Sequence, residues 1–283
     1  MLCTSKEMIN KAYKEGYAVP SINTQGGTYD IIRAICDIAE ERRSPVILAH
    51  YMSTGIYAGH DWFVEVAKWC ADKVSVPVAI HLDHGDSFET AMYCLKLGFT
   101  SLMVDFSNDP IKENAKKTNE VIRVSKEFGV PVEAEVGVLA RIDQYNDEEK
   151  TQITKFEDVV EFLEICRPDM LALGVGNAHG FYTSEPNINQ SLLIKTKEYA
   201  NTPLVLHGGT GIPERMIKEA ISNGIAKINF GTLVRTKYVE FLQEAFHSIN
   251  HNNHSWKISQ YAKQKLEKII NQIIDLSGSA NKV

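Results

Sequence analysis

Residues 76–105 read VPVAIHLDHGDSFETAMYCLKLGFTSLMVD. The pattern predicts a buried strand over Pro77–Leu82, an amphipathic helix over Ser87–Leu97 and a second apolar strand over Ser101–Val104. Gly98 directly follows the helix, where glycine commonly ends a helix and turns the chain toward the next element. This stretch is one strand–helix–strand unit, and such units build parallel sheets.

The same unit recurs along most of the chain. The expected strands are Tyr17–Ile22, Pro45–Ala49, Pro77–Leu82, Ser101–Val104, Pro131–Val136, Asp169–Leu173, Pro203–Leu206 and Ala226–Asn229. The expected helices are Thr28–Arg42, Asp61–Lys73, Ser87–Leu97, Asn114–Phe128, Lys155–Cys166, Leu192–Tyr199, Glu214–Asn223 and Leu233–His247. Proline stands at the start of four of these strands, at positions 45, 77, 131 and 203, where its missing N–H does no harm.

Eight repeats of about 30 residues predict an α/β fold, a (β/α)8 TIM barrel. An additional C-terminal helix is expected over Ser259–Leu276. No linker is visible, so we expect one catalytic domain over residues 1–283. A doubly wound open sheet is the alternative, but it usually carries fewer strands and an early glycine fingerprint, which this sequence lacks.

Composition and charge narrow the function classes. The chain has 283 residues, 44% hydrophobic and 23% charged, with a net charge of −6. A negative net charge argues against nucleic acid as a partner, and no stretch has the length of a membrane span or the pattern of a signal peptide. The five cysteines show no paired spacing and are expected to be reduced thiols, so we expect a cytoplasmic protein with no membrane partner.

Polar side chains cluster at the expected strand ends, which form the catalytic face of a TIM barrel. In chain order they are Asp83, His84, Asp105, Glu135, His179 and His207. Each of the three histidines stands beside a glycine, and three imidazoles around an open position are a catalytic zinc arrangement. Ordinary polar capping is the alternative interpretation. His81 either orients Asp83 or belongs to the core.

Two glycine-containing loops follow the seventh and eighth strands. Gly208-Gly209-Thr210-Gly211 leads into a helix, and Asn229-Phe230-Gly231-Thr232 does the same. Backbone N–H groups at such turns bind anions, and barrels commonly bind phosphate at these two loops. A plain strand-to-helix turn is the alternative.

With these motifs the sequence resembles the class II, zinc-dependent ketose-bisphosphate aldolases, and among them tagatose- and fructose-bisphosphate aldolases. The resemblance runs from Gly16 to Asn281. The motifs that carry it are Arg43–Leu48, His81–His84, Glu113–Asn114, Val132–Glu135, Ala178–Gly180, Val205–Pro213 and Lys227–Asn229.

The resemblance implies reversible, zinc-dependent aldol cleavage of a ketose 1,6-bisphosphate, with tagatose or fructose as the sugar, to dihydroxyacetone phosphate and glyceraldehyde 3-phosphate. It implies His84, His179 and His207 as zinc ligands, Asp83 as the proton donor, and Asp105 and Glu135 at an additional or alternative metal position. The implied substrate-binding residues are Asn23, Gly180, Gly208, Gly209, Thr210, Asn229, Phe230, Gly231 and Thr232. A monovalent cation, Na+ or K+, near the phosphate and a homodimer or homotetramer are also implied.

The sequence departs from the family pattern at three places. Ala140-Arg141 replaces a glycine pair, and Asp143 stands where the family carries a catalytic glutamate, so Asp143 is the second predicted catalytic residue. Tyr51 replaces a small hydroxyl residue, and Phe230 and Gly231 are also unusual. Arg141 is either a ligand for an anionic substrate group or a solvated loop charge.

Three alternatives to this function stay open, and the first two come from these departures. The first is an aldolase for another phosphorylated ketose or a deoxy sugar acid. The second is a sugar-phosphate-binding barrel that has lost turnover. The third is a Schiff-base aldolase, which would use Lys227 and would need that lysine to be desolvated and neutral.

Overall fold

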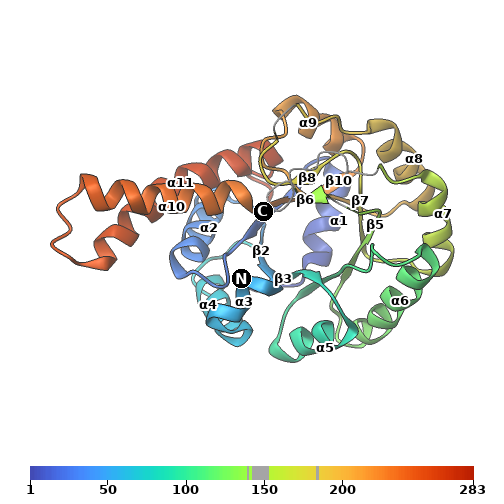
Figure 1. Ribbon diagram of the computed structural model, residues 1–283, viewed down its shortest axis with the longest axis horizontal. Helices are drawn as coiled ribbons and strands as arrows, with labels where there is room; N and C mark the ends of the chain where they lie inside the picture. The colour runs from blue at the N-terminus through green and yellow to red at the C-terminus, as the bar shows by residue number, and fades with distance from the viewer. Residues whose placement is uncertain (139, 142–152, 183–184) are drawn as a thin grey trace.

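Eight parallel strands close into a barrel in the computed structural model (Figure 1). The structure describes residues 1–138, 140–141, 153–182 and 185–283. The strand order is β1-β10-β9-β7-β5-β4-β3-β2, and the barrel closes because β1 pairs with both β2 and β10. The barrel strands are β1 (Val19–Asn23), β2 (Val46–Tyr51), β3 (Val78–Gly85), β4 (Ser101–Val104), β5 (Val132–Val136), β7 (Met170–Leu173), β9 (Leu204–Leu206) and β10 (Ile225–Phe230).

Most of the helices surround the barrel and connect one strand to the next, whereas the first precedes the strands and the last two follow them (Figure 1). They are α1 (Ser5–Glu15), α2 (Tyr29–Arg42), α3 (Gly55–Ala58), α4 (His60–Ala71), α5 (Phe88–Leu97), α6 (Ile111–Glu127), α7 (Phe156–Ile165), α8 (Gln190–Ala200), α9 (Glu214–Ser222), α10 (Thr232–Ser248) and α11 (Ser255–Ser277), with a 3-10 turn, η1 (Met52–Thr54), before α3. The predicted (β/α)8 barrel with an additional C-terminal helix is confirmed. That last helix begins at Ser255 rather than Ser259.

The prolines mark the strand starts, as predicted. β2, β3, β5 and β9 each begin directly after proline. Three of these prolines still contribute their carbonyl to the neighbouring strand. Val46 N–H donates to Pro77 O at 3.1 Å, Leu102 N–H to Pro131 O at 3.0 Å, and Leu171 N–H to Pro203 O at 3.0 Å. Proline lacks an N–H donor but keeps its carbonyl acceptor. It is therefore tolerated at the start of a strand, before the ladder of hydrogen bonds needs its N–H.

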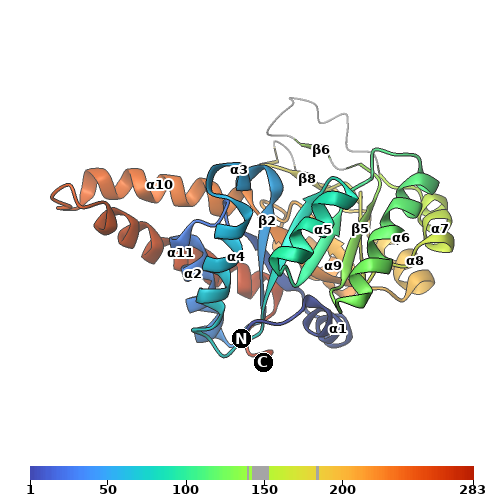
Figure 2. The ribbon, with the colours of Figure 1, turned by 90° about the horizontal axis from the view of Figure 1, so that it is seen from below.

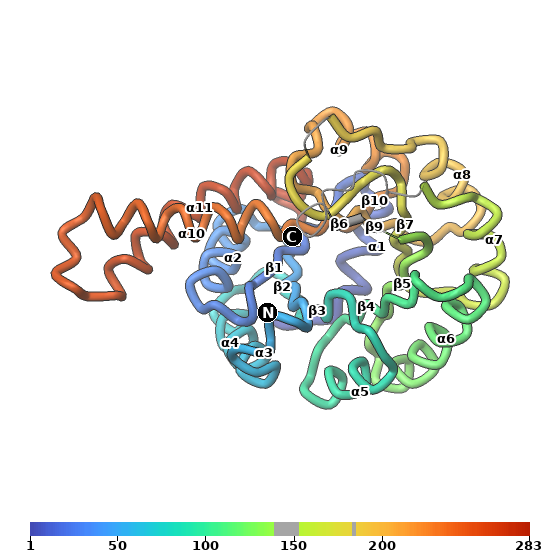
Figure 3. Tube along the Cα trace, in the orientation of Figure 1, coloured from blue at the N-terminus to red at the C-terminus, as the bar shows by residue number. Residues whose placement is uncertain are grey.

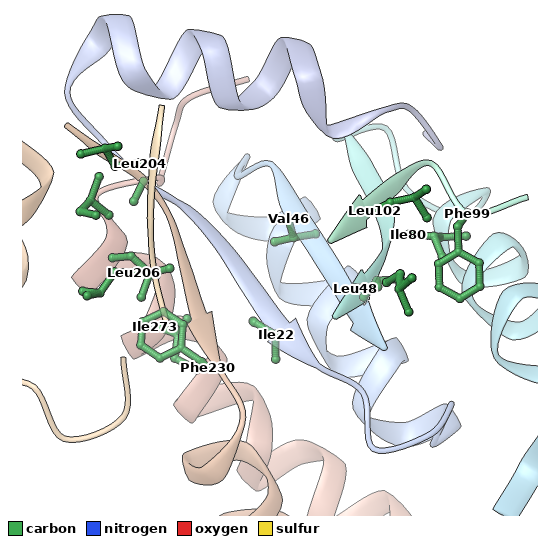
Figure 4. Close-up of a cluster of buried hydrophobic side chains, with 14 of the residues drawn as sticks. Ile22, Val46, Leu48, Ile80, Phe99, Leu102, Leu204, Leu206, Phe230 and Ile273 are labelled. Carbon is green, nitrogen blue, oxygen red and sulfur yellow. The ribbon is translucent and has the colours of Figure 1, made fainter. Parts of the chain in front are cut away.

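The apolar side chains form two cores. The larger lies between the strands and the surrounding helices and includes Ile22, Leu48, Leu206 and Phe230 (Figure 4). The smaller one fills the barrel interior below the strand ends and includes residues of α1, such as Met8. Figure 2 shows α1 and both chain termini at one end of the barrel and α3, β6 (Ala140–Arg141) and β8 (Ala178–His179) at the other. The interior is thus closed at the N-terminal end, and only the C-terminal strand ends are left for a site.

Helices α10 and α11 form a hairpin that extends away from the barrel (Figure 3). The two helices pack on each other, and α11 returns along α2. Lys263 Nζ of α11 lies 2.9 Å from Asp37 Oδ2 of α2, and Ala18 N–H donates to Ser277 O at 2.9 Å. The base of the hairpin is therefore fixed to the barrel.

Candidate active site

A bulge at the end of β3 turns two consecutive side chains into the barrel. Between the paired positions Leu82 and Gly85, β3 has two residues where β4 has one. These two residues are Asp83 and His84, and His84 has a φ of 54°. Neighbouring strand residues normally point to opposite faces, and a non-glycine residue with positive φ is uncommon and clusters at functional sites. The bulge is what allows both side chains to face the same site.

The three predicted zinc-binding histidines meet at one point. Nε2 of His84 lies 3.1 Å from Nδ1 of His207, and one ring nitrogen of each of His84, His179 and His207 lies within 4.8 Å of the others. Two nitrogens bound to a tetrahedral zinc at about 2.0–2.1 Å lie about 3.3–3.4 Å apart. The donor set therefore fits one zinc ion with a position open to substrate.

Carboxylates fix how two of these imidazoles face the common point. His84 Nδ1 lies 2.7 Å from Asp105 Oδ2, and His207 Nε2 lies 2.9 Å from Glu133 Oε1. A carboxylate can only accept, so each of these nitrogens carries hydrogen and the opposite nitrogen is left for a metal. Burial lowers the pKa of His84, but Asp105, Asp83 and Glu135 outweigh burial and raise the pKa to about 9.

A second group of possible ligands shares His84. Atoms of His84, Asp105 and Glu135 also lie within 4.8 Å of one another. Burial raises the pKa of the Glu135 carboxyl well above its ordinary value, and the charge of Asp105 adds to this effect. Among the described residues, the buried Oε2 atom of Glu135 has no hydrogen-bond partner, so this carboxyl has an oxygen available for a cation.

Asp83 lies beside the histidine cluster. Its Oδ1 atom is 4.0 Å from Nε2 of His84 and accepts a hydrogen bond of 3.1 Å from the side-chain amide of Asn229. Asp83 is largely buried, and its side chain lines a cavity of about 130 Å³. A carboxylate next to a metal position and open to a cavity can transfer a proton to or from a bound molecule.

That cavity brings together most of the predicted substrate-binding residues. Those that line it are Asn23, Gly180, Gly208, Thr210, Asn229, Phe230, Gly231 and Thr232. Gly208 has a φ of 64°, and a Cβ there would meet Ala178 O at 2.0 Å, so only glycine fits. Gly209 is not among the described residues that line the cavity, and its N–H donates to Asn229 O at 3.0 Å.

A family model for class-II fructose-bisphosphate aldolase matches residues 3–282. The chain belongs to this family.

Comparison with individual proteins agrees. The aldolase is 33% identical to a fructose-bisphosphate aldolase of Thermus caldophilus over the whole of both chains. It is 32% identical to the D-tagatose-1,6-bisphosphate aldolase subunit GatY of Klebsiella oxytoca, over 98% of each chain. The crystal structure of the YdjI aldolase of Escherichia coli K12 superposes with a TM-score of 0.87 at 31% identity, covering 100% of this chain and 99% of that one.

Family membership confirms the predicted family and enzyme class. The aldolase is a carbon–carbon lyase of class II, a family that depends on zinc and acts on phosphorylated sugars by aldol cleavage.

Lys227 of the aldolase is fully buried within the barrel and does not line the cavity. Its Nζ atom lies 2.7 Å from Glu133 Oε2 and 3.2 Å from His81 Nε2. An amine paired with a carboxylate and shielded from the cavity is not placed to attack a carbonyl. The geometry therefore does not support the Schiff-base alternative. His81 contacts Lys227 and Ser101, at 2.8 Å, rather than orienting Asp83.

Two of the unusual residues have a structural explanation. Phe230 is 1% exposed, and its side chain packs in the outer core beside Leu206 (Figure 4), so the bulky ring is accommodated outside the barrel interior. Tyr51 lines the cavity, and its ring centroid lies 6.2 Å from that of His84. The third unusual place, with Asp143, lies outside the described residues, as does the side chain of Arg141.

Sequence reasoning missed several residues that line the cavity. They are Ser21, Gln25, Ala49, Thr54 and Arg235. The polar, glycine-containing run after the first strand, Asn23–Gly27, is a signal that could have identified Gln25, which has a φ of 53°. Arg235 lies in the first turn of α10, directly after the predicted phosphate loop.

Proposed function

We propose that this aldolase catalyses the reversible, zinc-dependent cleavage of a ketose 1,6-bisphosphate, tagatose- or fructose-1,6-bisphosphate, to dihydroxyacetone phosphate and glyceraldehyde 3-phosphate. The observation that carries the proposal is the 3.1 Å approach of His84 Nε2 and His207 Nδ1, beside His179 and next to Asp83. An imidazole that binds a metal through a ring-nitrogen lone pair is neutral, so three such ligands would leave the ion its full charge. When bound, zinc supplies a Lewis acid that stabilises the negative charge developing next to the broken bond.

Asp83 is the proposed proton-transfer group. As a carboxylate it accepts the proton of the C4 hydroxyl while the bond between C3 and C4 breaks. In the condensation direction it returns this proton to the aldehyde oxygen. The hydrogen bond from Asn229 holds Oδ1 of the Asp83 carboxylate in place. Because the two oxygens belong to one rigid planar group, this bond also limits where Oδ2 can point.

The phosphate of the dihydroxyacetone half is proposed to bind at the loops after β9 and β10. The loops meet where Leu233 N–H donates to Thr210 Oγ1 at 3.2 Å. Glycines at 180, 208 and 231 leave the backbone accessible at the cavity wall, where N–H groups can bind an anion. The monovalent cation, Na+ or K+, and the additional metal position at Asp105 and Glu135 remain part of this proposal.

A substrate panel tests the proposal. The zinc-loaded protein is assayed with tagatose- and fructose-1,6-bisphosphate, a ketose 1-phosphate and a deoxy sugar acid phosphate, and the aldehyde product is identified. We expect cleavage of a ketose 1,6-bisphosphate, loss of activity with EDTA and recovery with Zn2+. Activity that survives EDTA, or borohydride trapping of substrate on the protein, would overturn the zinc mechanism.

We also propose that the aldolase is a cytoplasmic homodimer or homotetramer formed from one catalytic domain, residues 1–283. The hairpin of α10 and α11 projects from the barrel (Figure 1). It carries three exposed large apolar side chains, Val239, Phe246 and Trp256, at 49%, 58% and 59%, and apolar groups that gather into a patch mark protein contacts. Sedimentation should give a mass of two or four chains. Among the described helices, none has the length and apolarity to cross a membrane.

A further inference from the structure

A group of buried polar side chains, two of them charged, lies inside the barrel, behind His207. Glu133 of β5, Lys227 of β10 and His81 of β3 are each 0% exposed. Glu133 uses one oxygen for His207 Nε2, at 2.9 Å, and the other for Lys227 Nζ, at 2.7 Å. The carboxylate is thus held at both oxygens between a cation and an imidazole.

A second bulge explains why Lys227 points inward. The register of β10 against β9 shifts between Ile225 and Lys227, so Ala226 and Lys227 both face the interior. Without the shift, alternation would direct Lys227 toward the surrounding helices. The bulge therefore places Lys227 where it can form its buried ion pair with Glu133.

The hydrogen-bond donors fix the protonated nitrogens. A carboxylate only accepts, so His207 carries hydrogen on Nε2 and presents its Nδ1 lone pair toward His84. The Lys227 ammonium only donates, so His81 accepts at Nε2 and donates from Nδ1 to Ser101 Oγ, at 2.8 Å. Nδ1 of His207 also lies 3.3 Å from the side-chain amide nitrogen of Asn229. An amide N–H can only donate, so this contact too requires a lone pair on Nδ1.

We infer that Glu133, with its charge balanced by Lys227, is a positioning residue that sets His207 to bind the catalytic zinc through Nδ1. This inference rests on the proposed zinc site. A buried ion pair is often no more stabilising than well-packed apolar residues of the same volume, so stability alone does not account for the pair. A carboxylate behind a metal-bound imidazole fixes its orientation and raises its basicity. Lys227 holds the second oxygen of Glu133, so the carboxylate does not point to where the three histidines meet.

Two variants separate positioning from a structural role. Glu133→Gln removes the charge that faces His207 but leaves Lys227 buried without a counter-charge. The double variant Glu133→Gln/Lys227→Met removes both charges. We expect zinc affinity, measured by competition with a chelating dye, to fall about 10- to 100-fold in both variants. The midpoint of urea unfolding should fall in the single variant and recover in the double variant, which buries no unpaired charge.

The matched control is Ser44→Ala, which removes the buried 2.8 Å hydrogen bond from Ser44 to Ser279 at the opposite end of the barrel. It should lower the unfolding midpoint and leave zinc affinity unchanged. Unchanged zinc affinity in Glu133→Gln would overturn the inference. So would recovery of both zinc affinity and stability in the double variant, because the pair would then be structural only.

One measurement does not depend on the variants folding. In wild-type protein carrying isotopically labelled histidine and cadmium in place of zinc, the metal should couple to Nδ1 of His207 and a proton should be found on Nε2. Coupling to Nε2 would contradict the inference while leaving the three-histidine site intact. Failure of the wild-type protein to bind zinc would instead contradict the proposed function.

Discussion

The side-chain amide of Asn229 donates a hydrogen bond of 3.1 Å to Oδ1 of Asp83. The two residues lie on β10 and β3, which are separated in the barrel by β1 and β2. Asn229 also belongs to the loop proposed to bind phosphate. This contact therefore joins the proposed proton-transfer group to the proposed phosphate site. The end of β10 contributes both to the phosphate loop and, through Asn229, to the position of the Asp83 carboxylate.

Replacement of Asp83 tests its chemical role. Asp83→Ala should retain bound zinc and lose kcat by about a hundredfold or more, the range for a general acid–base group. Steady-state assays together with metal analysis measure both quantities. Asp83→Asn is the matched control for shape, because it keeps the side-chain volume and removes the carboxylate. Near-normal turnover in both variants would remove Asp83 from the mechanism.

His207 should be required for metal content. His207→Ala removes one nitrogen from a site of three, and we expect the purified variant to contain much less zinc than wild type, with cleavage activity lost accordingly. Metal analysis of protein dialysed against a weak chelator provides the measurement. His247→Ala, in the exposed part of α10, is the control and should leave zinc content unchanged. Full zinc occupancy in His207→Ala would exclude this residue as a ligand.

Arg235 should contribute to binding of an anionic substrate. Of the described residues that line the cavity, Arg235 is the one that carries a permanent positive charge. Charge-assisted hydrogen bonds contribute about 1.5–3 kcal/mol, so Arg235→Ala should raise KM about tenfold or more, with a smaller change in kcat. Arg235→Lys should recover part of the affinity. A KM unchanged from wild type in Arg235→Ala would show that the arginine does not contact substrate.

The buried imidazole of His50 should make stability depend on pH. His50 Nε2 lies 2.7 Å from His60 Nδ1, and burial together with the neighbouring His60 lowers the pKa of His50 to about 3. The unfolded chain, with a pKa of 6.5 for this group, binds more protons below that pH. The contribution of His50 to the free energy of unfolding should therefore be fully present above pH 6.5 and should decrease as the pH drops toward 3.

Between pH 6.5 and pH 5, titration of His50 should lower the free energy of unfolding by about 2 kcal/mol, because one proton contributes about 1.36 kcal/mol per pH unit. Urea unfolding at a series of pH values measures it. His50→Gln keeps a polar side chain of similar size but cannot titrate, so its profile should be flatter over this interval. Parallel profiles for the two proteins would contradict the assignment of a depressed pKa to His50.

The sequence by itself determined the elements and their order. Apolar runs, prolines at strand starts and glycines at helix ends are local signals. Each of them sets the backbone conformation within a few residues of its own position. Strands therefore begin at Val46, Val78 and Val132, directly after proline, and Gly98 ends α5 with a φ of 97°. The same local pattern placed His84, His179 and His207 at strand ends.

Only the tertiary structure decided which way key side chains point. Alternation along β3 predicts opposite faces for Asp83 and His84, yet a bulge against β4 and a φ of 54° at His84 turn both inward. A shift against β9 does the same for Lys227. A bulge depends on the register between two strands distant in sequence, so no pattern within either strand can reveal it. The contact between Lys227 and Glu133 depends on that shift, because the shift turns Lys227 inward.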